Sequence, residues 1–124
     1  MWMIPPSVRI FLATEPADMR RSFDGLAAMV RDFLKGDPLS GHLFVFRNRR
    51  RDRVKILYWD RSGFCIWYKR LEQGVFRFPL SGKSSVEVEA PELALLLEGI
   101  DLAGARRRRR FSPRRAPAPS VFRR

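Results

Sequence analysis

The sequence has very few of the residues that disulfide, metal or nucleophilic chemistry requires. Cys65 is the one cysteine and His42 the one histidine among 124 residues. One cysteine cannot form an intramolecular disulfide, and one histidine without a neighbouring cysteine gives no metal-ligand pattern. Because chains without disulfides suit a reducing compartment, the cysteine count favours an intracellular setting.

Other signatures are missing as well. No apolar run approaches the length of a membrane span, and the opening MWMIPP lacks the basic start and long apolar stretch of a signal peptide. There is no glycine-rich phosphate loop. The acids are spread over turns and a helix start, whereas two-metal chemistry needs several in one cleft. We therefore expect no cofactor, no metal, no membrane partner and no catalytic residue, which predicts that the protein is not an enzyme.

Positive charge dominates what is present. Lysine and arginine number 25 against 13 acids, a net charge of +12, which attracts polyanions such as nucleic acid. From Gly104 onward the chain has nine arginines and no acid. That segment has no apolar periodicity, so burial cannot offset the entropy lost on ordering it. We expect a compact α+β domain over residues 1–103 and a disordered basic tail over residues 104–124.

The first third of the chain predicts a strand followed by a helix. The run from Val8 to Thr14 is β-branched and aromatic, which is typical of a strand. Ser22 is a good N-cap, and Gly36 can take the left-handed conformation that ends a helix. Between them, apolar residues recur at helical spacing. They are Phe23, Leu26, Ala27, Val30 and Leu34.

From His42 onward the pattern changes to short β runs, joined by turns that permit only hairpins. The runs predict four strands, over residues 42–47, 54–60, 64–71 and 75–79, with residues 84–90 as a short fifth. Pro91 and Gly99 then bracket a second apolar helix. The expected fold class is α+β: an antiparallel four- to five-stranded meander sheet packed by two helices, with a disordered basic C-terminal tail.

Side-chain alternation along these strands separates two faces if the turns keep the register even. We expect the helix that begins at Phe23 to cover the more apolar face. The second face mixes rings with cations and is either a second core layer under the Leu93–Leu97 helix, with charges at its rim, or a binding surface. The apolar face holds Leu43, Val45, Val54, Ile56, Tyr58, Cys65, Trp67, Phe76 and Phe78. The second face holds Phe44, Phe46, Lys55, Leu57, Trp59, Phe64, Ile66, Tyr68, Arg70, Val75 and Arg77.

Basic side chains are the candidate binding residues, because lysine and arginine neutralise phosphates and arginine also forks onto them. Trp59 and Tyr68 are candidates for stacking on bases or for packing in a protein interface. The competing interpretation of each charge run is a solvated surface, which we favour for Arg20 and Arg21. The candidate nucleic-acid-binding residues are Arg49, Arg50, Arg51, Arg53, Lys55, Lys69, Arg70, Arg77, Arg106, Arg107, Arg108, Arg109 and Arg110.

Several motifs in a fixed order resemble one known family. They are PADMRRSFDGLA, GHLFVFRNRRRDRVKILYWDRSGF, WYKRLEQGVFRFP and LLLEGIDL. Together they are similar to the TnpB-type accessory protein of the bacterial insertion-sequence-sixty-six transposon family, which is unrelated to the RNA-guided nuclease of the same name. The resemblance runs from about Ile4 to Leu102.

The resemblance implies an accessory role in transposition beside a separate DDE transposase and a small helix-turn-helix-type partner protein. It supplies no catalytic residue and implies a bacterial, cytoplasmic protein that joins the nucleoid when bound. With the charge pattern, it leads us to expect binding to DNA, at transposon ends, through the basic hairpin and tail. The alternative is a protein-interaction module that docks on the transposase without direct DNA contact. RNA binding ranks last because no RNA-recognition signature is present.

Overall fold

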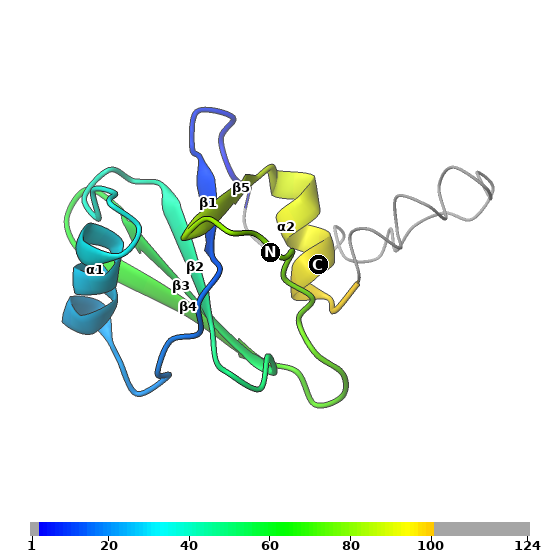
Figure 1. Ribbon diagram of the computed structural model, residues 1–124. Coiled ribbons are helices and arrows are strands. Elements are labelled where there is room, and N and C mark those ends of the chain that lie inside the picture. Colours follow the sequence, from blue (N-terminus) through cyan, green and yellow to red (C-terminus); the bar gives the residue numbers. More distant parts are fainter. Residues whose placement is uncertain (1–2, 101–124) are drawn as a thin grey trace.

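The computed structural model describes residues 3–100, which form a five-stranded sheet with helices on both faces (Figure 1). The predicted tail, residues 104–124, lies outside the described residues. The α+β class, the sheet and the two helices are confirmed. In chain order the elements are β1 (Ile10–Ala13), α1 (Phe23–Asp32), β2 (Leu43–Arg47), β3 (Arg53–Trp59), β4 (Phe64–Arg70), β5 (Ser85–Val88) and α2 (Ala90–Leu97).

The sheet is mixed, so the prediction of a purely antiparallel meander is wrong. The strand order is β4-β3-β2-β1-β5. β1 runs parallel to β2, with Ile10 opposite Leu43, whereas β2, β3 and β4 form the predicted antiparallel hairpins. Parallel neighbours need a crossover of about a dozen residues or more, and the segment containing α1 supplies it. On its other side β1 pairs antiparallel with β5, where Ile10 lies opposite Val88.

Residues 75–79, predicted as the fourth strand of the meander, form no strand. The amide of Leu71 donates to the carbonyl of Asp52 at 2.8 Å, and the amide of Phe76 donates to the carbonyl of Arg51 at 2.7 Å. These bonds draw the chain toward the turn between β2 and β3, so it does not run beside β4. The rings of Phe76 and Phe78 enter the core, where they are 0% and 9% exposed.

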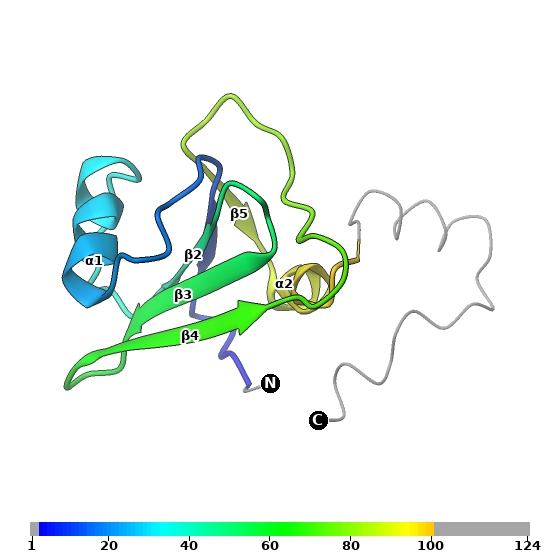
Figure 2. The same ribbon diagram turned by 90° about the horizontal axis from the view of Figure 1, so that it is seen from below.

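The two helices cover opposite faces of the sheet (Figures 1 and 2), in the reverse of the predicted arrangement. The predicted alternation of side chains between the two faces of β2, β3 and β4 is confirmed. However, α1 packs Leu26 and Val30 against Phe44, Phe46 and Leu57, the face predicted for the second helix. The handedness of the β1–α1–β2 crossover decides which face its helix covers, and side-chain periodicity does not encode that handedness.

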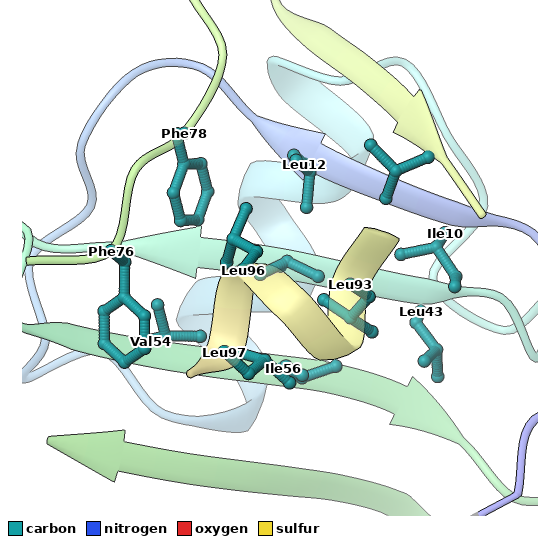
Figure 3. Packing of buried hydrophobic residues seen from close by; sticks show 12 residues of the cluster. Ile10, Leu12, Leu43, Val54, Ile56, Phe76, Phe78, Leu93, Leu96 and Leu97 are labelled. Carbon is teal, nitrogen blue, oxygen red and sulfur yellow. The ribbon is translucent and has the colours of Figure 1, made fainter. Parts of the chain in front are cut away.

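The larger hydrophobic core lies between α2 and the sheet. In Figure 3, Leu93, Leu96 and Leu97 point from α2 toward Ile56 and its neighbours, and Phe76 flanks them. Phe76 is therefore a core residue although it belongs to an irregular segment.

The ends of the helices follow the sequence signals in part. Ser22 occupies the N-cap of α1, but its side chain forms no capping hydrogen bond. After α1, Lys35 has the left-handed conformation (φ 57°) that was predicted for Gly36. At α2 the prediction is confirmed, because Pro91 lies in the first turn and Gly99 has a φ of 81°.

We predict that Phe76→Ala lowers the free energy of unfolding by about 3 to 5 kcal/mol, because it empties a fully buried site. Chemical denaturation of the full chain measures this change. Leu80, in the same segment but 92% exposed, is the matched control, and Leu80→Ala should change the free energy by less than about 0.5 kcal/mol. Equal effects of the two substitutions would contradict the core position of Phe76.

Candidate nucleic-acid interface

One side chain organises the turn between β2 and β3. The carboxamide oxygen of Asn48 accepts hydrogen bonds from the amides of Asp52 and Arg53, each at 3.0 Å. Its nitrogen donates to a carboxylate oxygen of Asp52 at 2.7 Å. This last bond is the main reason that the pKa of Asp52 is lowered. Asn48 thus binds the two ends of the turn together.

Neighbouring segments hold the same turn from outside. The amide of Ala17 donates to the carbonyl of Arg47 at 2.8 Å, which fixes the connector before α1. The bonds from Leu71 and Phe76 fix the loop after β4. At the bottom of Figure 1 the connector, the turn and this loop lie at the same end of the molecule. The backbone of the turn is therefore held in place by hydrogen bonds from two neighbouring segments.

Arg47 extends the positive charge beneath the turn. Its guanidinium donates to the carbonyl of Thr14 at 2.8 Å and lies 5.8 Å from the centroid of the Phe78 ring. Its Nε atom is buried and has no hydrogen-bond partner within residues 3–100. Burial, followed by repulsion from Arg51, lowers the pKa of Arg47. Cations around the turn thus already repel one another.

The tip of the turn presents three arginines to solvent. Arg49, Arg50 and Arg51 are all exposed, and within residues 3–100 none of their side chains forms a hydrogen bond or ion pair. Arg51 has a φ of 64°, a conformation that costs a non-glycine residue about 1 to 2 kcal/mol. A glycine would avoid that cost, so the local backbone does not account for an arginine here.

Three more of the predicted cations gather beside this tip. Strand register places Arg53 directly opposite Arg70, and like charges at such positions repel. Arg70 bonds to Glu72 at 3.0 Å. Arg77 is exposed and follows Phe76, whose amide binds the turn. We call Arg49, Arg50, Arg51, Arg53, Arg70 and Arg77 together the basic turn surface.

Two predicted lysines are held by the fold. Lys55 is only 9% exposed, and its ammonium donates to the carbonyls of Met19 and Arg21 at 2.7 and 2.9 Å. Lys69 donates to the carbonyl of Leu97 at 2.9 Å, at the C-terminal end of α2, where a cation is favourable. Lys55 thus holds the connector before α1 to the sheet, and Lys69 holds the C-terminal end of α2 to it, so we leave both lysines out of the basic turn surface.

The two candidate aromatic residues lie at opposite ends of the sheet. Tyr68 is 48% exposed and its hydroxyl accepts from Arg53 at 3.3 Å. The ammonium of Lys55 lies 4.8 Å from the centroid of its ring. Trp59 is at the far end of β3, about 20 Å from Arg53 at strand spacing, and packs edge-on against Phe64 at 5.1 Å. The structure thus brings Tyr68, but not Trp59, to the basic turn surface.

A cleft beside the turn was not foreseen from the sequence. It has a volume of about 500 Å³ and lies between residues 16–19 and the turn residues 48–50, 52 and 53. Its wall includes Asp18, whose Oδ2 atom accepts hydrogen bonds from Nε and Nη2 of Arg20. The shorter of these, from Nη2, is 2.7 Å and forms an ion pair. The hydrogen bond from Arg20 is the main reason that the pKa of Asp18 falls to about 2. Arg20 and Arg21 are both exposed, which agrees with the solvated surface predicted for them, and Arg20 adjoins the cleft through Asp18.

Cys65 and His42 have structural contacts. Burial, together with the adjacent Asp60, raises the pKa of the Cys65 thiol, which therefore stays protonated near neutral pH. The Nδ1 atom of His42 accepts from the amide of Arg9 at 2.9 Å. Within residues 3–100 no three His, Cys, Asp or Glu side chains are grouped so that they could hold a metal ion. In the same range, no helix has the length and apolar character needed to span a membrane.

Comparison with known proteins identifies the family. The family described as "IS66 Orf2 like protein" matches residues 8–107, so the chain belongs to this family and is a transposition-associated accessory protein. It is also similar to two uncharacterized proteins of Sinorhizobium fredii (strain NBRC 101917 / NGR234). One, y4jC, is 42% identical over 108 residues, 86% of this chain and 92% of the relative. The other, y4hO, is 40% identical over 95 residues, 77% of this chain and 83% of the relative. No solved structure gives a significant match.

We predict that Asn48→Ala destabilises the fold by about 1 to 3 kcal/mol, because it leaves turn amides without their acceptor. Thermal or chemical unfolding measures the change. Arg49→Ala, at the next position but exposed and unpaired within residues 3–100, is the control and should be almost neutral. If the two variants unfold alike, the turn does not depend on Asn48.

We also predict that Asp18 titrates with a pKa of about 2 rather than the ordinary 3.8. Its ion pair should stabilise the fold above pH 3.8 and cease to do so as the pH falls through about 2. Arg20→Gln should raise this pKa toward 3.8, and Arg21→Gln should move it much less. A carboxyl NMR titration reads out all three proteins. An ordinary pKa in the unmodified chain would refute the pair.

Proposed function

We propose that this accessory protein binds DNA of its insertion element through the basic turn surface and breaks no bond itself. The observation that carries the proposal is the tip of the turn, where Arg49, Arg50 and Arg51 are exposed and unpaired within residues 3–100. Hydrogen bonds from Asn48 and from neighbouring segments hold the backbone of this tip in place. A guanidinium that has no protein partner can take a phosphate without giving up an ion pair. Binding then releases counterions from the DNA, which favours association at low salt.

The conformation of Arg51 supports a functional reason for the charge. Non-glycine residues in strained conformations cluster at functional sites, since the rest of the fold must offset their cost. Arg51 has such a conformation at the exposed tip of the turn. Lys35 and Arg61 share this conformation, so it supports the proposal only together with the clustering of Arg49, Arg50 and Arg51. Contact with a phosphate would account for an arginine at a position where glycine fits the backbone better.

Tyr68 is the proposed stacking residue. Its ring is 48% exposed beside Arg53 and Arg70, so a base and its phosphate could be bound together. Stacking of this kind needs a base whose face is not covered by a stacked neighbour, as at an opened or single-stranded end. We therefore propose that the protein favours opened or single-stranded transposon ends over intact duplex. Trp59 is not part of this proposal.

The proposed contacts to the DNA backbone carry no sequence information by themselves. Arg106, Arg107, Arg108, Arg109 and Arg110 in the basic tail lie outside the described residues, and we propose that they add an electrostatic arm with the same lack of sequence choice. Selection of the element's ends would then depend on its other proteins, the DDE transposase and the small helix-turn-helix-type partner. This division of labour leaves strand cleavage and joining to the transposase.

The acidic residues around the turn support a role without catalysis. Asp18 is bound by Arg20, and Asp52 is bound by Asn48. Both carboxylates thus hold local structure, and their lowered pKa values keep them ionised near neutral pH. A general acid or base needs a pKa close to the working pH, which neither carboxylate has.

Docking on the transposase without DNA contact remains the second candidate. It was based on the ring-rich face of the sheet, and α1 buries Phe44, Phe46 and Leu57 on that face. Trp59 and Tyr68 stay at least partly exposed at its two ends. A partner would therefore meet two separate rings rather than one aromatic patch, which makes this candidate the weaker one.

We predict that the triple variant Arg49→Gln, Arg50→Gln, Arg51→Gln binds DNA more weakly and with a flatter salt dependence. On duplex DNA the slope of log K against log salt is negative, and its magnitude should fall by about 0.9 for each phosphate contact removed. Fluorescence anisotropy across a salt series, on element ends and on random DNA, measures both quantities.

The matched control is the triple variant Arg31→Gln, Lys35→Gln, Arg61→Gln. It removes the same charge from exposed residues of α1, the segment after it and the β3–β4 turn. Its salt slope should stay close to that of the unmodified protein. Equal losses in the two triple variants would show that only net charge matters and would refute a localised site.

A further inference from the structure

The two edges of the sheet differ in how they are protected. β5, at one edge, has four residues, and Glu87 on it is paired with Arg9 at 2.7 Å. β4, at the other edge, has seven residues and pairs with β3 from end to end without a bulge. Figure 2 shows β4 as the outermost strand, and within residues 3–100 no strand lies beyond it.

The first five residues of β4 lack the features that usually stop an edge strand from pairing with another chain, and its two cations lie at the C-terminal end. Such edges are shortened, bulged, or interrupted by proline or charge. From Phe64 to Tyr68 the strand has no charge and no proline. Its side chains from Phe64 to Trp67 are only half-buried, so an added strand would cover more of their surface. This edge is suited to main-chain pairing with a partner strand.

We propose that β4 pairs antiparallel with β4 of a second copy of this chain, about a two-fold axis at Trp67. Trp67 is the middle residue of β4, so this register uses the whole strand. It places Phe64 opposite Arg70 of the other copy and Cys65 opposite Lys69. The interface is isologous, because a two-fold axis brings the same surface of both copies together.

The distribution of charge selects a second copy as the partner. Both cations of β4, Lys69 and Arg70, lie at its C-terminal end. Antiparallel self-pairing sets them against the uncharged end, where the guanidinium of Arg70 can lie on the ring of Phe64. Parallel self-pairing would oppose like charges, which destabilises a sheet. The strand is therefore complementary to itself in one direction only.

The dimer would space the two basic turn surfaces for duplex DNA. The axis runs perpendicular to the joined sheet, so both copies of α1 and both turns lie on the same side. Along the strands, the two Arg70 residues would be about 20 Å apart and the two tips, each roughly two residues further out, about 33 Å apart. Because each tip also lies about two strand spacings to the side of the axis, the direct distance between the tips is about 38 Å. One helical turn of B-DNA is about 34 to 36 Å. This spacing argument rests on the proposed DNA binding, but the dimer does not.

Sedimentation of the full chain without nucleic acid tests the dimer, and a cysteine pair tests its register. Lys69→Cys, with Cys65 retained, should form a disulfide-linked dimer under mild oxidation, because directly opposite Cα atoms lie about 4.5 to 5.5 Å apart. Within one chain the same two positions are about 13 Å apart, too far for a disulfide. Lys69→Cys with Cys65→Ser is the control and should not cross-link.

Each outcome decides the proposal. The proposal is supported if the protein is a dimer and if Lys69→Cys cross-links only when Cys65 is retained. A monomer at every soluble concentration, or a monomer that pairs only with the transposase, overturns it, and equal cross-linking in the control overturns the β4 register. If Lys69→Cys does not fold, hydrogen exchange of the unmodified chain gives the answer, since the β4 amides that point away from β3 should exchange faster on dilution. The Arg49, Arg50, Arg51 triple variant should stay dimeric, which separates this test from that of DNA binding.

Discussion

The hydrogen bonds of the Asn48 carboxamide are the constraint on which the rest of the site depends. They close the turn between β2 and β3, and the connector before α1 and the loop after β4 both attach to that turn through main-chain bonds. Together with these main-chain bonds, the Asn48 carboxamide holds the turn closed against the repulsion among its arginines. A fixed backbone is what allows the three arginines of the tip to be exposed together in one place.

The sequence predicted the alternating faces of β2, β3 and β4 because their turns keep the register even, and side-chain periodicity reports that directly. It did not predict the parallel pairing of β1 with β2, although strand, helix and strand in succession are typical of such a unit. It also failed for residues 75–79, whose β-like alternation is real but serves the core beneath α2. Local pattern specifies which side chains are buried, and long-range hydrogen bonds decide which segments pair.

The same distinction applies to the site. A run of arginines at a hairpin was enough to predict exposed cations at Arg49, Arg50 and Arg51. Lys55 looked equivalent in the sequence, yet its ammonium is taken by two main-chain carbonyls, which no local pattern reveals. Tyr68 and Trp59 likewise looked alike, and only the direction of the strands shows that one lies beside the basic turn surface and the other at the far end.

The most direct test of the central claim is an amide NMR titration of the full chain with a transposon-end DNA that carries a short single-stranded overhang. The account predicts that the largest shifts fall on residues 16–21, 48–53, 68–70 and 77, with small shifts in α2. Shifts confined to the basic tail, or centred on α2 with the turn unaffected, would contradict it.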